Sequence, residues 1–319
     1  MKVLHITTNY PSKEFPIFGI FVKEQVESLQ ELGIENEVFY CDGQNKGFKK
    51  YITYVPKLWW KLLTTKYDIL HCHHALSAII LCMTGWPLFK KCVLSYQNDP
   101  DKEWGHKCFR LFNILFSKFI VKNRSPYLKY PKMCYLPNGC NENFFTPLNQ
   151  DDCRRELNLS KDIIYIMYMD SNKGVRTQKR KDRFDQTLEI LRNKYNYDNI
   201  MSIELRNTPR HLIPLYINAC NAHLISSDFE GSPNSVKECM CCNTPVVSTD
   251  VGNVREMIGD IDGCYVSDSF SAEELAECLN KVLLNSADFN GRQKFLDKGY
   301  GMKTVAQKLE SIYKSIIKH

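Results

Sequence analysis

The sequence predicts an α/β protein made of two domains with largely parallel sheets. Along the whole chain, short apolar runs of strand length alternate with longer segments of helical periodicity. Runs such as 163–168 are continuously apolar, which is typical of strands buried on both faces of a parallel sheet. The length of 319 residues corresponds to about two domains of ~150 residues each.

The predicted strands of the first half lie at 3–7, 37–40, 68–72, 91–96, 118–121 and 133–136. Between the first two, residues 21–32 carry Val22, Val26 and Leu29 at near-helical spacing, and Gly33 is a typical helix stop. The first two strands are therefore expected to be joined by a crossover helix, as in parallel sheets.

The second half repeats this pattern, with predicted strands at 163–168, 200–205, 222–226 and 244–248. The polar segment 150–160 separates the halves and is interpreted as a linker with a short helix. We therefore expect a first domain over residues 1–148, a second over 149–300 and a terminal helix over 301–319.

Composition and charge exclude several classes of protein. Apolar residues make up 44 % of the chain and charged residues 24 %, as in ordinary globular proteins. No apolar run reaches the ~20 residues needed to cross a bilayer, and Met1 leads directly into a strand, so we expect no secretion signal and a cytoplasmic location. The net charge of +6 suits a phosphate-bearing ligand, an anionic membrane surface or a soluble surface, and no nucleic-acid-binding signature accompanies it.

The spacing of cysteines and histidines does not predict a metal site. Among the 14 cysteines, Cys239, Cys241 and Cys242 lie on one predicted helix without a partner CxxC pair. His71–His74 includes Cys72, but neighbouring residues of a strand face opposite sides, so at most two of the four share a ligand. We expect reduced thiols that pack as small hydrophobes.

The most informative stretch is 229–252. Ser232 and Pro233 are typical of the N-cap and the first position of a helix that follows a strand and a loop. The helix would run to about Cys242, with Asn243 as its stop. Free N–H groups at such a helix start bind phosphate. The hydrogen-bond donors to the phosphate would come from Gly231, Ser232, Asn234 and Ser235.

Two carboxylates flank this predicted anion site. Glu230 lies in the loop before the helix, and Glu238 lies about 1.5 turns into it, roughly 8 Å further along the axis. Carboxylates on both sides of a diphosphate suit a ligand that also carries hydroxyl groups on both sides, and a nucleotide sugar is such a ligand. The alternative is an ordinary βαβ unit with a capping loop and one exposed glutamate.

The surroundings of these glutamates resemble a known donor site. Glu230, seven residues and Glu238 are followed by Thr244-Pro-Val-Val, by Asp250-Val-Gly and by Glu256. Together they closely resemble the signature of family 4 glycosyltransferases of the GT-B fold. The resemblance implies two Rossmann-like domains with parallel sheets facing across a cleft, the last helix crossing back to the first domain. It also implies a retaining glycosyltransferase of the hexosyltransferase type, with no cofactor and no metal beside its nucleotide-diphosphate sugar.

A basic loop, 172–185, follows the first strand of the second half. The resembled family uses an Arg and a Lys at this strand-to-helix turn to hold the donor diphosphate, and Arg176 and Lys181 have the matching Arg-x4-Lys spacing. Arg180 and Arg183 are alternatives, because the loop is longer and more basic than usual and an Arg fork binds two phosphate oxygens. Without the resemblance, the loop would be interpreted as a solvated charge run.

The other donor-side roles also follow from the resemblance. The predicted catalytic set is Glu230, Arg176 and Lys181, with Glu230 orienting sugar hydroxyls. Glu238 would bind the ribose, and the loop that holds Arg206 and His211 would seat the base. Two Asp-x-Asp pairs, 99–101 and 260–262, are interpreted as loop residues, since so short a metal-binding motif is weak.

The acceptor side is expected in the first domain. Its loop 8–21 holds Gly19, which would let the backbone approach a ligand or would serve only as a turn glycine. In the resembled family, the end of the fourth strand commonly carries a His-Gly pair beside the donor sugar, where this chain has Gln97 and Asn98. Glutamine can hydrogen-bond a sugar hydroxyl, but it does not titrate. His73, at the end of the third predicted strand, is placed on the same side.

The segment 48–66 is basic and aromatic. Lysines beside Trp59 and Trp60 on a short helix suit a membrane interface, and the family often uses lipid-linked acceptors. We therefore expect Lys49–Lys66 to make a peripheral contact with the inner face of the membrane. The alternative is a helix that packs its tryptophans inward behind a solvated lysine face.

Taken together, these features predict sugar transfer from a nucleotide-diphosphate donor to a hydroxyl of a glycan or lipid-linked acceptor, in surface polysaccharide synthesis. Two alternatives stay open. A non-catalytic member that binds nucleotide sugar or acts as a scaffold would show binding without turnover. A nucleotide-sugar epimerase would need titratable groups at the sugar, and Gln97 argues against it.

Overall fold

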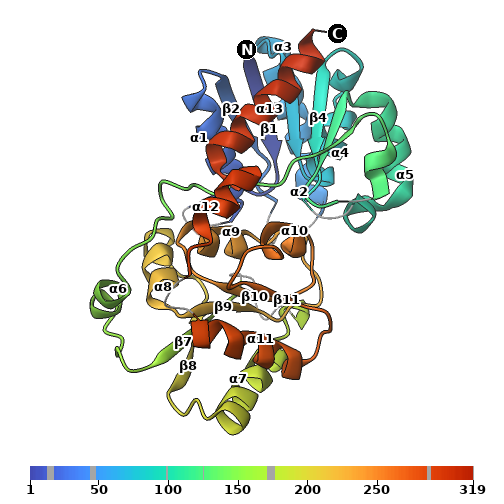
Figure 1. Ribbon diagram of the computed structural model, residues 1–319. Helices are drawn as coiled ribbons and strands as arrows, with labels where there is room; N and C mark the ends of the chain where they lie inside the picture. The colour runs from blue at the N-terminus through green and yellow to red at the C-terminus, as the bar shows by residue number, and fades with distance from the viewer. Residues whose placement is uncertain are drawn as a thin grey trace. The chain divides into compact units, whose positions relative to one another are not determined.

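The computed structural model describes residues 1–12, 18–43, 48–97, 100–124, 126–170, 177–285 and 289–318, with the side chains of 48, 102 and 104–108 excepted (Figure 1). The chain forms two compact units, Met1–Gly139 with Met302–His319, and Cys140–Gly301. Each unit is a parallel sheet with helices on both faces, which confirms the predicted fold class.

The N-terminal unit holds a six-stranded parallel sheet in the order β2-β1-β3-β4-β5-β6. Its strands are β1 (Lys2–Thr7), β2 (Glu35–Tyr40), β3 (Ile69–His73), β4 (Lys91–Ser95), β5 (Lys118–Val121) and β6 (Met133–Tyr135). Its helices are α1 (Ile20–Glu31), α2 (Phe48–Ile52), α3 (Tyr54–Thr64), α4 (Ala75–Met83), α5 (Pro100–Leu115) and α13 (Met302–Ile317).

Alternate residues along these strands face two helix layers. Leu4 and Leu70 pack with α3, α4 and α5, whereas Val3, Ile69 and Val93 pack with α1 and α13. The inner strands of this sheet are buried on both faces, and the strand residues that face the helices are mainly apolar in their first halves. The last helix of the chain, α13, therefore belongs to the same unit as the first strand.

The C-terminal unit holds a five-stranded parallel sheet in the order β11-β10-β9-β7-β8. Its strands are β7 (Ile164–Met169), β8 (Ile200–Leu205), β9 (Ala222–Ile225), β10 (Val246–Thr249) and β11 (Tyr265–Ser267). Its helices are α6 (Gln150–Glu156), α7 (Lys181–Tyr195), α8 (Ile213–Ala219), α9 (Asn234–Cys241), α10 (Val254–Ile258), α11 (Ala272–Asn285) and α12 (Arg292–Phe295). Helices α7 and α11 cover one face, and α8, α9, α10 and α12 cover the other.

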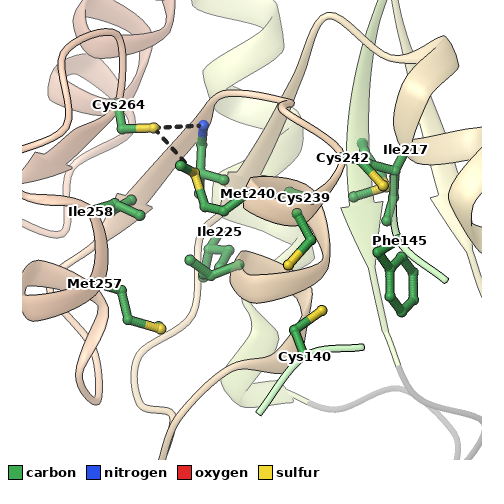
Figure 2. Close-up of a cluster of buried hydrophobic side chains, with 14 of the residues drawn as sticks. Cys140, Phe145, Ile217, Ile225, Cys239, Met240, Cys242, Met257, Ile258 and Cys264 are labelled. Atoms are coloured by element: carbon green, nitrogen blue, oxygen red, sulfur yellow. Dashed lines mark hydrogen bonds between the residues drawn. The ribbon is translucent and has the colours of Figure 1, made fainter. Parts of the chain in front are cut away.

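Cysteines pack as small hydrophobes in the core beneath α9 (Figure 2). Cys239 and Cys242 are buried among Ile217, Ile225 and their neighbours. The thiol of Cys264 lies 3.6 Å from the Met240 sulfur, and burial raises its pKa to about 12. All thirteen cysteines that the structure describes are free thiols. The cysteine-rich helix therefore contributes its thiols to the packing of this core.

Helix α3 presents its tryptophans to solvent. Trp59 is 44 % exposed and Trp60 63 % exposed, whereas Leu58 and Leu62 of the same helix are buried. The alternative in which the tryptophans pack inward is therefore wrong. Within the described ranges, no helix combines the length and the apolar character needed to cross a bilayer.

Candidate functional site

Loops at the carboxyl ends of β7 and β9 carry several of the predicted donor-side residues of the C-terminal unit. In the strand order, β8 lies next to β7 toward one edge of the sheet, and β10 lies next to β9 toward the opposite edge. The chain therefore leaves the neighbouring strands β7 and β9 in opposite directions. A doubly wound sheet opens a crevice at such a switch point, and ligands bind there, outside the carboxyl ends of the strands. The loop after β7 ends at Lys179 and Arg180, directly before α7, and the loop after β9 carries Glu230.

The carboxylate of Glu230 is held by two side chains. Its Oε1 atom lies 2.6 Å from the Lys179 ammonium and accepts a hydrogen bond of 2.8 Å from Ser227 Oγ. The side chains of Lys179 and Glu230 are only 13 % and 15 % exposed. Lys179 ends the 3-10 turn η3 (Thr177–Lys179), directly before α7. It was missing from the predicted site, and the only sequence signal for it is the density of basic residues in this loop.

Lys181, the lysine with the family spacing, makes other contacts. It is the first residue of α7, and its ammonium pairs with Asp185 and, at 2.9 Å, with Glu204. It also lies 5.6 Å from the centre of the Tyr168 ring. These partners belong to α7, β8 and β7, so Lys179 and not Lys181 stands beside Glu230. Arg176 lies outside the described residues.

Arg180 and Arg183 are engaged within the protein. Both bind Asp228, Arg183 Nη2 at 2.8 Å and Arg180 Nη1 at 3.2 Å. Arg183 also donates to the carbonyl of Ser226 at 2.6 Å, and the Asp228 N–H donates to the carbonyl of Gln178 at 2.8 Å. These bonds tie the basic loop to the loop after β9. The two arginines thereby fix the position of Lys179 relative to that loop.

Helix α9 begins one residue later than predicted. Pro233 is its N-cap residue, with an extended backbone (φ −64°, ψ 122°), and Ser232 does not cap the helix. The buried Ser232 hydroxyl has no hydrogen-bond partner among the described residues. Lys237, wholly buried, donates to the Ser232 carbonyl and to Asn234 Oδ1, both at 3.2 Å. A free hydroxyl and a buried cation therefore lie at the helix start.

The hydroxyl of Ser235 is already used. His223 Nδ1 lies 2.9 Å from the Met167 carbonyl, which can only accept, so Nδ1 carries the hydrogen. The other nitrogen, Nε2, then accepts from Ser235 Oγ at 3.0 Å. Burial lowers the pKa of His223 to about 4, which keeps the ring neutral. Ser235 therefore offers a ligand its backbone N–H and not its hydroxyl hydrogen.

The second glutamate of the motif is held by an arginine. Glu238 is buried, and its Oε1 atom lies 2.6 Å from Nη1 of Arg210, whose guanidinium stacks 4.7 Å from the centre of the Phe145 ring. Arg210 was not predicted. Its neighbours in the base loop are exposed, with Arg206 3.8 Å from Asp170 and with His211 on the surface.

The turn after β10 packs directly on the Glu230 loop. Gly252 has a left-handed backbone (φ +58°), and a Cβ placed there would lie 2.2 Å from the carbonyl oxygen of Gly231 and 3.0 Å from that of Glu230. Thr249 Oγ1 also donates to the Ser227 carbonyl at 2.7 Å. The Asp-Val-Gly part of the motif thus has a steric reason, because only glycine fits this contact.

On the predicted acceptor side, Gly19 is a turn glycine. Its backbone is left-handed (φ +69°), and a Cβ there would lie 2.3 Å from the carbonyl of Asn9, within the same loop. Its close contact is therefore internal to the loop. Asn98 lies outside the described residues.

Gln97 and His73 lie at the carboxyl ends of neighbouring strands. The Gln97 N–H donates to Glu103 at 2.5 Å, and its side-chain oxygen accepts from Asn138 at 3.4 Å. His73 is buried, with Nε2 3.0 Å from Nδ1 of His5. Both residues belong to the N-terminal unit, and the predicted donor-side residues belong to the C-terminal unit.

Candidate metal ligands have partners within the protein. Asp101 accepts a hydrogen bond from Tyr127, and Asp260 pairs with Lys298. Among the residues that the structure describes, one group of three ligand-type side chains lies together: His5, His71 and His73. As predicted, His71 and His73 share one face of β3. The third histidine comes from β1, which local spacing does not reveal.

One family of known proteins matches part of the chain. Residues 185–302 match the family described as glycosyl transferases group 1. No curated protein matches the chain in sequence.

Solved structures match the fold of almost the whole chain. Sucrose-phosphate synthase from Thermosynechococcus elongatus matches with a TM-score of 0.75 and 14 % identity over 100 % of both chains. Anabaena HepE in complex with UDP matches with a TM-score of 0.74 and 14 % identity over 99 % of this chain and 100 % of that one. The catalytic domain of Arabidopsis thaliana starch synthase IV, bound to ADP and acarbose, matches with a TM-score of 0.71 and 13 % identity over 100 % of both. The chain therefore has the GT-B fold, and most of its C-terminal unit is similar to a glycosyltransferase family.

Proposed function

We propose that the protein is a retaining glycosyltransferase that moves a sugar, of hexosyl type, from a nucleotide-diphosphate donor to a hydroxyl group. The observation that carries this is the Lys179–Glu230 ion pair of 2.6 Å, in which Glu230 lies in the loop before α9. Two residues after Glu230, the buried hydroxyl of Ser232 has no hydrogen-bond partner among the described residues. A cation, a free hydroxyl donor and helix N–H groups suit a diphosphate, and a carboxylate at the same place suits sugar hydroxyls.

The reaction would break the bond between the anomeric carbon and the diphosphate oxygen and form one to the acceptor oxygen on the same face. The acceptor proton would leave with the diphosphate. Lys179, Ser232 Oγ and the N–H groups from Asn234 onward would stabilise the negative charge that grows on the leaving group. Such preorganised donors usually supply the largest part of catalysis. With these groups in place, the reaction would need neither a metal nor another cofactor.

Glu238 would bind the ribose hydroxyls of the donor. Arg210 holds Oε1 of its buried carboxylate, which fixes the orientation of the side chain before a ligand arrives. HepE from Anabaena, one of the structures with the same fold, was solved in complex with UDP-glucose. A nucleotide sugar is therefore the ligand class to test first, with a glycan or lipid-linked acceptor in surface polysaccharide synthesis.

A donor panel tests this function. We expect turnover of one nucleotide sugar in the presence of acceptor, with retention of anomeric configuration by NMR. Replacing Glu238 by alanine should raise the KM for that donor about 10- to 100-fold, because a buried carboxylate would lose its bonds to the ribose. Glu189→Ala, an exposed glutamate on α7, is the matched control and should leave KM unchanged. Unchanged donor turnover in both Glu238→Ala and Arg176→Ala would refute the donor site.

We also propose that α2 and α3 contact the inner face of the membrane, at a cytoplasmic location. The exposed Trp59 and Trp60 next to the lysines of 49–66 support this. In flotation with anionic liposomes, the wild-type protein should rise with the vesicles, and the Trp59→Ser/Trp60→Ser variant should stay at the bottom. Trp86→Phe, in the same unit, is the control. Equal flotation of both variants would contradict the contact.

A further inference from the structure

The N-terminal sheet becomes polar toward the carboxyl ends of its strands, on the face covered by α1 and α13. Val3, Ile69, Val93 and Ile120 lie on this face and are apolar. Two residues further along each strand come His5, His71, Ser95 and Lys122, and His73 is paired with Ser95. All five are buried. Buried polar groups are ordinarily hydrogen-bonded, so each of these needs a partner.

A chain of hydrogen bonds fixes the hydrogens of two histidines. Asn36 donates through Nδ2 to the Ile34 carbonyl at 2.8 Å, so its Oδ1 atom accepts from His5 Nε2 at 2.9 Å. Nδ1 of His5 then carries a lone pair and accepts from His73 Nε2 at 3.0 Å. In the neutral ring, His73 Nδ1 must carry a lone pair too. It is buried and has no partner among the described residues.

Lys122 is a buried cation that follows β5, at the carboxyl edge of the same sheet. It is 1 % exposed, and within the described part of the chain its ammonium has no hydrogen-bond partner. The titratable groups that interact electrostatically with Lys122 are His71, His73, Glu103 and Cys134. Burial lowers the pKa of Lys122 to about 8. The Glu103 carboxylate is occupied by two backbone N–H groups, those of Ala75 at 3.1 Å and Gln97 at 2.5 Å.

Gln97 adds a second unused donor at the same edge of the sheet. In the structure, Oε1 accepts a hydrogen bond of 3.4 Å from Asn138 Nδ2, and Nε2 is the other end of the amide. That nitrogen is buried and has no partner among the residues described. Gln97 follows β4 and Lys122 follows β5, and these neighbouring strands are parallel, so both donors lie at one carboxyl edge. Ligands of doubly wound sheets bind at this edge.

We propose that Lys122, Gln97 and His73 bind a phosphate group of the acceptor at the carboxyl edge of the N-terminal sheet, a site that rests on the glycosyl transfer proposed above. The ammonium of Lys122 and the amide of Gln97 donate to phosphate oxygens. The His73 lone pair accepts from a hydroxyl group next to that phosphate. A phosphorylated sugar carries both groups. A hydroxyl alone would leave the charge of Lys122 uncompensated, and a buried unpaired charge is costly.

Calorimetric titration of the full chain with glucose 1-phosphate tests the site. Lys122→Met should weaken binding at least about ten-fold, because a charge-assisted hydrogen bond is lost. Lys118→Met is the matched control, since Lys118 begins β5, the strand that Lys122 follows, and donates to the Pro131 carbonyl. The affinity of this variant should equal that of the wild type. Gln97→Leu should weaken binding as well. Equal affinity in wild type and Lys122→Met would overturn the proposal.

The wild-type protein alone gives a second readout. A bound anion favours the charged form of Lys122, so binding at pH 8.5 should take up protons, which titrations in two buffers of different ionisation enthalpy measure. Lys118→Met should keep this uptake. Binding without proton uptake in the wild type would overturn the site even if Lys122→Met does not fold.

A further experiment distinguishes a soluble sugar phosphate from a lipid-linked one. It also distinguishes failure of the phosphate site from failure of the proposed glycosyl transfer. Polyprenyl-phosphate glucose in detergent micelles replaces glucose 1-phosphate, and Lys122-dependent binding of either compound supports the site, the tighter one identifying its source. Donor turnover that is insensitive to Lys122→Met with phosphorylated acceptors would overturn the site and leave the proposed function intact. Lys122-dependent phosphate binding without turnover of any donor would support the phosphate site and overturn the proposed glycosyl transfer.

Discussion

Replacing Lys179 by methionine should lower kcat/KM for the nucleotide sugar by about 10²- to 10³-fold, the usual effect of removing one preorganised donor from a leaving group. Methionine keeps the length of the side chain and removes its charge. The ammonium lies 2.6 Å from Glu230, so the substitution also releases the carboxylate that would orient the sugar. The measurement is initial-rate kinetics with the donor identified in the panel.

Lys181→Met is the matched control for this prediction. Lys181 lies two residues further along, and its ammonium pairs with Asp185 and Glu204, both partly exposed. Ion pairs of this kind contribute about 0–1 kcal/mol, so the variant should fold and keep kcat/KM within about three-fold. Hydrogen–deuterium exchange in 222–252 checks that Lys179→Met remains folded. A larger loss of activity in Lys181→Met than in Lys179→Met would return the diphosphate role to Lys181.

Much of the fold was predictable because most strands are buried on both faces. Ten of the eleven strands that the structure describes were predicted to within two residues at each end, because apolar runs bounded by turn residues give a clear signal when a strand is mostly buried. The missed strand, β11, has three residues, and Tyr265 and Val266 are only partly buried. A run this short carries no periodicity that a sequence can reveal.

The site was predictable where it is local and not where it depends on an irregular turn. Glu230 and Glu238 are fixed by one loop and one helix, so their spacing alone places them on either side of the helix start. Lys179 and Lys181 differ because Arg180 between them takes a left-handed backbone (φ +49°), which directs the lysines to different neighbours. The sequence around Arg180 does not predict a left-handed backbone, because non-glycine residues rarely adopt it.

Long-range partners were also beyond local spacing. Arg210 meets Glu238 from another loop, 28 residues earlier in the chain. Lys122 affects the pKa of His71 and His73 on β3 only because the sheet order places β5 two strands away from β3. Such contacts depend on which strands are neighbours in the sheet. The apolar pattern of a strand predicts the strand but not its neighbours. These are the residues on which the proposals above most depend.

Replacing Gly252 by alanine should displace the loop that carries Glu230, because the turn after β10 packs against that loop. The left-handed backbone costs a non-glycine residue roughly 1–2 kcal/mol. The new Cβ would also lie 2.2 Å from the Gly231 carbonyl oxygen, a contact that only backbone movement relieves. Overpacking of this kind costs about 1–3 kcal/mol more. Because Glu230 and Gly231 must move, we expect kcat/KM to fall about 100-fold, as when a catalytic group is displaced by about 1 Å.

Gly85→Ala separates the steric clash from the backbone strain. Gly85 is also left-handed (φ +75°), but an added Cβ there meets nothing within 4 Å. It should therefore show only the conformational cost, as faster hydrogen–deuterium exchange in 75–95, and should leave kcat/KM unchanged. Gly252→Ala should speed exchange in 225–252 by a larger factor, because strain and clash add at one position. If the two variants lose equal stability and Gly252→Ala keeps full activity, the turn after β10 does not hold the Glu230 loop in place. The position of Glu230 would then depend on Lys179 and Ser227 alone.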